Sequence, residues 1–443
     1  MIRRRLLLAA GSLLLGCSWG RFDDVTADTP VVILEKPSGV GAGFGSALTP
    51  VTLDGRALLL VHGTPGRTKA ALFDLGNATS PLEDALSENF CTSETGGCFL
   101  GSSSAPIPRG KAPSGDEVQH CYALGVGAKL DNPAGVLIEC EDKTVFTIPV
   151  PPDFRAQIQQ GLDNGLPEVV ALASDDREEP AIVAASVERN LAFYYPNVAE
   201  DPVLLDAGTH RIKGFGETVD VARTGSQNLV VVGGPTLAGI QLFGVEDGAE
   251  PTYLGCLRGD EAFGRALASG ELLGAPALAV SDAERVTVFD VARLLELSAA
   301  GESSCIGFGD LPDGAVVTSV ECGETGAVKG CGASDFGASV AIGDVDGDGD
   351  GELAVGAPGM KARDVSSAGA VAYFDLEDAD DTTITDLKFI ASAESGDRLG
   401  TSLAMARLDS RHVVVAGVPG SARSAIFYCP SFLPGRLAGG RCD

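Results

Sequence analysis

An all-β fold assembled from repeated units is predicted by three features of this 443-residue chain. The same order of short aliphatic strands, glycines and prolines recurs along most of the sequence. One copy cannot bury both faces of its own strands, so neighbouring copies must pack on each other. The 44% hydrophobic content excludes a disordered chain, and 58 glycines fit short strands joined by many turns.

The charge balance excludes one class of partner. The chain has 32 Lys and Arg against 61 Asp and Glu, which gives a formal charge of −29. A nucleic-acid partner requires a basic face, so we expect none. Only 4 histidines are present, which leaves little room for multi-histidine metal sites or several imidazole bases.

Residues 1–16 are predicted to be a signal peptide. Arg3–Arg5 precede a ten-residue apolar run, Leu6–Leu15, which is too short for a permanent membrane span. The run ends in Leu14-Leu15-Gly16-Cys17, which resembles a bacterial lipobox, so Cys17 is the expected lipidation site. The alternative is an ordinary signal peptide with an incidental cysteine. Residues 17–30 would form a tether to the membrane, and Ser18 after the cysteine favours the outer membrane of a bacterial envelope.

The repeat is clearest at 336–374. There Phe336-Gly337 opens a strand, an acidic loop follows, a second strand ends in Gly356-Ala357-Pro358, and a third strand begins after Gly369. We count seven copies. Four weaker ones begin at Phe44, Phe215, Phe263 and Leu399, and two degenerate ones lie near 121–150 and 169–196.

These units resemble FG-GAP repeats, which form the headpiece of integrin α subunits and occur in many bacterial envelope proteins. The resemblance implies a seven-bladed β-propeller of four-stranded antiparallel blades over residues 31–443. The last copy stops after its third strand, and Val31–Leu34 has no partner in its own copy. We therefore predict that this N-terminal strand completes the last blade and closes the ring; the alternative is a stray surface strand.

Two segments interrupt the repeat, and the cysteines are predicted to form disulfides. The segments, near 76–114 and 295–331, are interpreted as insertions that either bind a partner or are simply surface loops. Without Cys17, ten cysteines remain in an exported chain. Their spacing suggests the pairs Cys91–Cys98, Cys121–Cys140, Cys256–Cys305, Cys322–Cys331 and Cys429–Cys442, although sequence alone does not fix the connectivity.

One loop predicts a metal site. Asp344, Asp346, Asp348 and Glu352 stand at positions 1, 3, 5 and 9 of the acidic loop, and Asp350 stands at position 7. Clustered carboxylates repel one another unless a cation neutralises them, and Ca²⁺ accepts many oxygen ligands in flexible geometry. Mg²⁺ demands stricter geometry, and an EF-hand would need a glutamate where Val355 stands. We predict one Ca²⁺ per chain, with a solvated acidic hairpin as the alternative.

Two other positions were weighed as sites. Residues 175–179 occupy the place of this loop in the third copy, but Arg177 stands in the middle and glycine is absent. His62 stands where the family has alanine and is interpreted as a loop residue rather than a base. The sequence contains no motif that pairs a nucleophile with a base.

These observations favour a monomeric, non-enzymatic, calcium-binding lipoprotein that is anchored by its lipid. Its loops would bind a protein or a polysaccharide. Two alternatives remain: an enzyme that uses carboxylates of the central channel, as some propeller glycosidases and lyases do, and a purely structural envelope protein.

Overall fold

The structure is a computed structural model. The described residues are 20–21, 31–37, 43–53, 56–63, 71–75, 99–112, 114–127, 135–140, 145–149, 171–175, 177, 179–186, 191–197, 200–205, 215–247, 249–297, 305–322, 334–345, 349–361, 365–375, 386–391, 395–408, 411–420 and 423–428.

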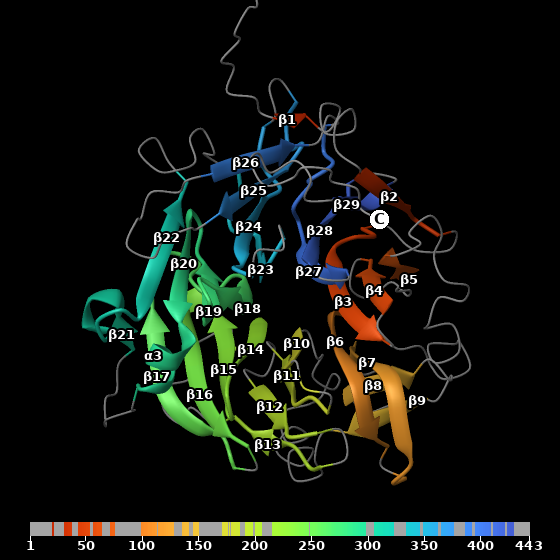
Figure 1. Cartoon of the computed structure of the whole chain (residues 1–443), viewed down its shortest axis with the longest axis vertical. Coiled ribbons are helices and arrows are strands. Elements are labelled where there is room, and N and C mark those ends of the chain that lie inside the picture. The colour runs from red at the N-terminus through yellow and green to blue at the C-terminus, as the bar shows by residue number, and fades with distance from the viewer. Residues whose placement is uncertain are drawn as a thin grey trace, which may run out of the picture.

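Seven antiparallel sheets stand around a central axis (Figure 1). The first three contain β3 (Ala47–Leu53), β4 (Arg56–His62) and β5 (Ala71–Asp74); β6 (Phe99–Lys111), β7 (Glu117–Gly127), β8 (Gly135–Cys140) and β9 (Val145–Pro149); and β10 (Ala171–Ser174), β11 (Ile182–Ser186), β12 (Leu191–Tyr195) and β13 (Val203–Leu204).

The other four sheets follow in chain order. They contain β14 (Thr218–Thr224), β15 (Gln227–Gly234), β16 (Gly239–Glu246) and β17 (Thr252–Arg258); β18 (Leu267–Leu272), β19 (Ala275–Ser281), β20 (Arg285–Asp290) and β22 (Val316–Glu321); β23 (Ser339–Gly343), β24 (Glu352–Ala357), β25 (Ala370–Asp375) and β26 (Asp386–Ala391); and β27 (Leu403–Leu408), β28 (Arg411–Gly417), β29 (Arg423–Tyr428) and β2 (Val31–Glu35).

The prediction of an all-β propeller with four-stranded antiparallel blades is confirmed, but the predicted count of seven such blades is not. Six sheets have four antiparallel strands, whereas the first has three among the described residues. That sheet ends at β5, and the residues from 76 to 98 that follow it lie outside the described part.

The N-terminal strand β2 pairs with β29 of the last sheet, as the sequence predicts, with Val31 opposite Tyr428. That this pairing closes a complete ring stays a prediction. A second N-terminal strand was not expected: β1 (Gly20–Arg21) pairs in parallel with β26 on the outer edge of the sixth sheet. The predicted tether, 17–30, is therefore partly docked on the propeller.

The predicted bounds of both insertions are too wide. Residues 99–111 of the first form β6, the innermost strand of the second sheet. Its serines and its two prolines, Pro106 and Pro108, hid it, yet an edge strand tolerates proline because half of its N–H groups need no partner. Within the second segment, β22 is the outer strand of the fifth sheet. The remainder holds β21 (Ile306–Gly307), which pairs in parallel with β17 on the outer edge of the fourth sheet, and the 3₁₀ turn η5 (Phe308–Asp310).

Neighbouring sheets meet where the repeat has its Phe-Gly and Gly-Ala-Pro segments. In the sixth sheet Gly337 adopts a positive φ of 79°, and its N–H donates to Gly356 O at 3.0 Å. A Cβ on Gly356 would lie 2.1 Å from Gly400 O of the seventh sheet, so only glycine fits there. Ser339 Oγ donates to the same carbonyl at 2.8 Å. The motif is thus an inter-blade contact.

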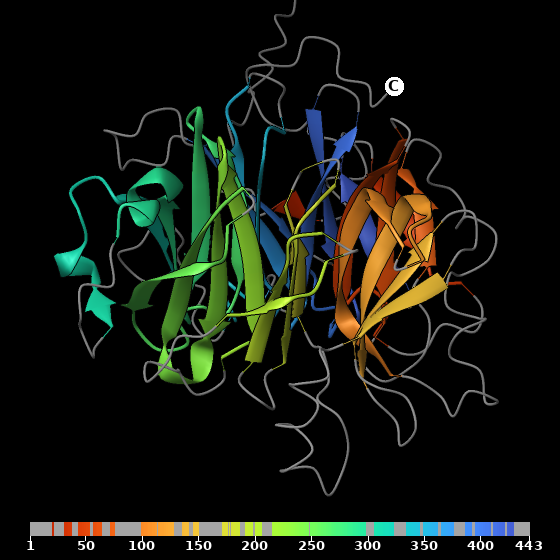
Figure 2. The same cartoon turned by 90° about the horizontal axis from the view of Figure 1, so that it is seen from below.

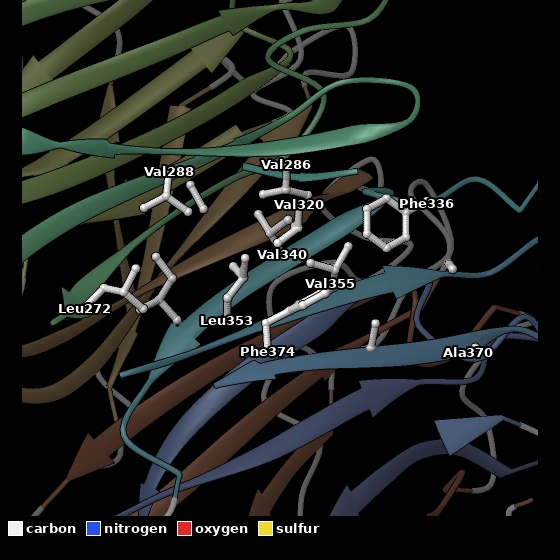
Figure 3. Close-up of a cluster of buried hydrophobic side chains, with 14 of the residues drawn as sticks. Leu272, Val286, Val288, Val320, Phe336, Val340, Leu353, Val355, Ala370 and Phe374 are labelled. Carbon is white, nitrogen blue, oxygen red and sulfur yellow. The ribbon is translucent and has the colours of Figure 1, made fainter. Parts of the chain in front are cut away.

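The hydrophobic core is divided among the junctions between sheets. Each of six buried clusters takes its side chains from two neighbouring sheets. Figure 3 shows the one between the fifth and sixth sheets, where Val288 and Val320 lie close to Val340, Leu353 and Phe374. The third to seventh sheets each bury both faces in these clusters, against different neighbours, so the sheets are expected to fold cooperatively. Figure 2 shows them standing side by side.

Two predicted disulfides are present. Cys121–Cys140 links facing residues of β7 and β8, and Cys256–Cys305 ties β17 to the residue before β21. Cys322 is also disulfide-bonded, but its predicted partner, Cys331, lies outside the described residues, as do Cys91, Cys98, Cys429 and Cys442.

Helices contribute little to the described fold. They are α3 (Val291–Leu295) and the 3₁₀ turns η4 (Pro235–Leu237) and η5. Within the described part of the chain, no helix has the length and apolar character needed to cross a membrane.

Candidate functional site at the channel mouth

The central axis holds a cavity of about 960 Å³ lined by all seven innermost strands. Its wall exposes polar and apolar surface in similar amounts, and its hydroxyl-bearing residues are Thr49, Ser104, Ser174 and Ser269. The ionisable residues of the wall belong mainly to one mouth, where the first hairpin of each sheet turns. They are Asp175, Asp220, Arg223, Glu271, Asp344, Arg407 and His412.

The acidic loop of the sixth sheet lies at this mouth. It connects β23 to β24, whose ladder ends with Gly343 opposite Glu352. This register brings the two ends of the loop together, because residues 344 and 351 follow directly on a paired position. Asp344, Gly349 and Gly351 line the cavity.

Two of the predicted ligands fold back onto the loop. Asp344 Oδ2 accepts a hydrogen bond from the N–H of Gly349 at 3.1 Å. Glu352 is 2% exposed, and its Oε2 accepts from the N–H of Val345 at 2.6 Å. A carboxylate that is so deeply buried needs compensation, which hydrogen bonds and a cation both provide.

The Asp350 side chain approaches the fifth sheet. Its Oδ1 lies 4.0 Å from where a Cβ on Gly274 of the fifth sheet would stand. Gly349 has a φ of 98°, so the turn that precedes Asp350 uses a conformation that favours glycine.

The remaining two predicted ligands, Asp346 and Asp348, lie outside the described residues. The described side chains alone contain no cluster of three or more Asp, Glu, His or Cys placed to hold a metal. The donors that are described fit a hard cation, since they are carboxylates from both ends of one short loop. The chemistry of this set suits Ca²⁺, which Asp344, Asp346, Asp348 and Glu352 would hold together with the Asp350 carbonyl.

The corresponding loop of the third sheet has its own cation. Asp175, whose side chain is fully buried, accepts from Arg177 Nε at 2.6 Å. The N–H of Ala181 donates to Asp175 Oδ1 at 3.1 Å, and Asn228 Nδ2 of the fourth sheet donates to Oδ2 at 2.9 Å. Arg177 also contacts Asp247 of the fourth sheet at 3.2 Å. The guanidinium therefore neutralises the loop and joins two sheets.

Asp220 was not predicted from the sequence. It stands on β14, the innermost strand of the fourth sheet, and lines the cavity. Burial raises the pKa of Asp220 to about 6, although hydrogen bonds with Ser269 and Val221 oppose that shift. Its Oδ2 is buried and has no hydrogen-bond partner among the described residues.

His62 is not a loop residue, which corrects the prediction. It ends β4 opposite Ala47, and its carbonyl accepts from Gly45 N–H at 2.8 Å. Gly356 has the same role in the sixth sheet, so His62 replaces the glycine of the repeat rather than its alanine. The second copy has no Phe-Gly segment, and this leaves room for the larger side chain.

Ser104 lies beside His62, but the Ser104 hydroxyl donates its proton to another residue and not to the histidine. His62 Nε2 is 2.7 Å from Ser104 Oγ, and both side chains are buried. Ser104 Oγ donates to Thr49 Oγ1, which in turn donates to Ser104 O at 3.3 Å. In this order Nε2 carries the proton and donates it to Ser104. Burial also lowers the pKa of His62 to about 4, which makes it a weak base.

Comparison with known proteins supports the fold and the loop together. The family model of the FG-GAP repeat matches residues 336–374, which include β23, β24 and β25 of the sixth sheet and the acidic loop. Together with the arrangement of the sheets, this match supports an FG-GAP β-propeller. No curated protein matches the chain in sequence.

Proposed function

We propose that this chain is a calcium-binding FG-GAP propeller that serves as a non-enzymatic scaffold in a bacterial envelope. The observation that carries the proposal is the carboxylate loop in the one copy that the family model matches. The calcium ion would neutralise that loop and hold the first hairpin of the sixth blade. We also propose that the first sheet completes a closed ring of seven blades.

The scaffold would present loops to a protein or polysaccharide partner. Disulfides support a rigid framework: Cys121–Cys140 links two neighbouring strands and Cys256–Cys305 fixes the start of β21. An enzyme of the channel would need two carboxyl groups with separated roles. Among the described channel carboxylates, Asp220 has a pKa raised by burial, whereas Asp175 is already bound to Arg177. Catalysis is therefore the weaker proposal.

Lipidation at Cys17 would anchor the propeller beside its sixth blade. Only Ser18 and Trp19 separate Cys17 from β1, which pairs with β26. Three residues span at most about 10 Å, so the outer edge of that blade would lie close to the membrane surface. The whole ring would then stand edge-on at the anchor.

The anchor is tested by metabolic labelling with a radioactive fatty acid in the native host. We expect the full chain to incorporate label and to fractionate with membranes, and a Cys17→Ser variant to lose both properties. Label on the Cys17→Ser chain, or a wild-type chain without label, would contradict the lipoprotein proposal.

The scaffold role is tested by affinity capture from envelope extract with the full chain, in parallel with Ca²⁺ and with a chelator. A matched Asp344→Asn variant separates loss of the ion from other effects of the chelator. A partner that is retained by the wild type and lost both on chelation and with the variant supports a calcium-ordered binding surface. A turnover-dependent activity that disappears with Asp220→Asn would overturn the non-enzymatic proposal.

A further inference from the structure

We infer that the acidic loop of the sixth blade is a joint between three blades, in which His412 and the turn Glu271–Gly274 hold its two ends in the cation-binding conformation. The inference rests on the calcium proposal above and goes beyond it. It assigns to His412, which belongs to the seventh sheet, a positioning role for a site in the sixth.

The first end of the loop is held by the seventh sheet. The N–H of His412 donates to Asp344 O at 2.6 Å, and His412 Nδ1 lies 3.2 Å from the same oxygen. With its proton on Nδ1, the imidazole donates a second hydrogen bond to that carbonyl. A Cβ on Gly343 would lie 2.9 Å from Met405 Sδ and 3.0 Å from His412 Cγ. The backbone before Asp344 is therefore pressed directly against the seventh sheet.

The second end is held by the fifth sheet. A Cβ on Gly351 would stand 1.9 Å from Glu271 O, so the two backbones are in close contact and no larger residue fits. Asp350 reaches toward Gly274 of the same turn. Just inside the loop, Ile342 packs on Gly270, where a Cβ would lie 2.7 Å from its Cγ2.

The two ends of the loop are thus held by different sheets, the first by the seventh sheet and the second by the fifth. A cation that draws Asp344 and Glu352 together acts on the backbone at residues 344 and 351, and these are the points that the seventh and fifth sheets contact. By linkage, whatever stabilises the closed loop increases cation affinity, and the bound cation stabilises both inter-blade contacts in return. In the third sheet, the Arg177 guanidinium takes the place of the cation, because it bonds both Asp175 of its own loop and Asp247 of the fourth sheet.

Calcium titration by calorimetry tests the role of the His412 side chain. We expect His412→Ala to raise the Ca²⁺ dissociation constant of the full chain about fivefold, because one hydrogen bond of about 1 kcal/mol is lost. His412→Asn places an amide N–H near the position of Nδ1 and should restore most of the affinity. Thr218→Ala is the matched control, since it removes the hydrogen bond from Thr218 Oγ1 to Gly264 O (2.7 Å) at another junction. It should lower stability and leave the affinity unchanged.

A second measurement uses only the wild-type chain. Hydrogen exchange followed by mass spectrometry should show that Ca²⁺ slows exchange at His412 and at the Glu271–Gly274 turn, while Gly225 and Ser226 of the fourth sheet do not respond. Protection confined to residues 344–352, or equal affinities for the wild type and His412→Ala, would overturn the inference and leave the calcium site standing. Absence of any Ca²⁺ binding by the wild type would instead overturn the calcium proposal and the inference with it.

Discussion

Two loops at the same place in their sheets surround their first carboxylate differently. In the third sheet, Asp175 starts the loop, is buried, and has the Arg177 guanidinium 2.6 Å away. In the sixth sheet, Asp344 starts the loop and is partly exposed, and its Oδ2 accepts a hydrogen bond from the N–H of Gly349 at 3.1 Å. One loop carries its cation in the sequence, and we propose that the other takes it from solution.

The comparison explains why acidic residues alone do not identify a metal site. An arginine inside the loop satisfies the charge and also reaches Asp247 of the next sheet at 3.2 Å. It holds two blades together at any calcium concentration. Under our calcium proposal, the loop without arginine makes its junction dependent on the ion.

Asp220 is a third case, in which neither an arginine nor the proposed calcium ion accompanies the carboxylate. It faces Ser269 rather than a cation, and burial raises its pKa to about 6. The contrast between these three carboxylates generates predictions of decreasing size.

The largest effect is expected from Arg177→Met. The substitution leaves the Asp175 carboxylate buried and unpaired, which costs about 3–5 kcal/mol in the free energy of unfolding. Urea unfolding with chelator present measures it, and the double variant Asp175→Asn/Arg177→Met should recover most of the loss. A loss below about 1 kcal/mol would mean that the guanidinium is not the cation of this loop.

Calcium removal should have the next largest effect. At a Ca²⁺ concentration one hundred times the dissociation constant, the bound ion adds about 3 kcal/mol to the stability of the folded chain. Thermal unfolding should therefore shift upward with Ca²⁺ in the wild type and in Arg177→Met, and should not shift in Asp344→Asn. An equal shift in Asp344→Asn would place the ion elsewhere.

Asp220→Asn should stabilise the chain at alkaline pH. The pKa of Asp220 is raised from 3.8 to about 6 on folding, so the folded state binds the proton more tightly than the unfolded state. Its stabilising contribution is complete below pH 3.8 and is lost as the pH rises through 6, by about 2–3 kcal/mol. Urea unfolding with chelator at pH 8 and pH 4 should show the variant ahead at pH 8 only. An equal difference at both pH values would exclude a titrating Asp220.

The smallest effect is expected at the junction of the first and second sheets. His62→Ala removes a hydrogen bond to Ser104 and should cost about 1–2 kcal/mol at pH 8. The pKa of His62 is lowered from 6.5 to about 4, so its contribution is present above pH 6.5 and is lost as the pH falls through 4. Acidification from pH 8 to 5 should therefore destabilise the wild type more than the variant, opposite in sign to Asp220. An identical pH profile for both chains would contradict this assignment.

The repeat pattern predicted the fold well because each copy carries its own local signals. Glycines with positive φ, such as Gly337, and glycines without room for a Cβ, such as Gly356, recur at similar places in several copies. The second copy lacks these glycines, and there the sequence placed residues 99–111 in an insertion. These residues form β6, whose three serines and two prolines are tolerated because the strand lies at the edge of its sheet. The short pairing of β1 with β26 left no periodic signal to find.

The site was predictable only within one loop. The spacing from Asp344 to Glu352 identified the acidic hairpin, but His412 lies 68 residues further along the chain and belongs to another sheet. Asp220 and Ser269 become neighbours only through the packing of two innermost strands. A sequence pattern records contacts within a hairpin, whereas contacts between blades require the ring.

The central claim is that the loop of the sixth blade binds a cation, whereas the corresponding loop of the third blade is neutralised by arginine. Native mass spectrometry of the full chain titrated with Ca²⁺ tests it most directly. The account predicts one tightly bound Ca²⁺ in the wild type and in Arg177→Met, and none in Asp344→Asn. No bound Ca²⁺ in the wild type, or three or more per chain, would contradict it.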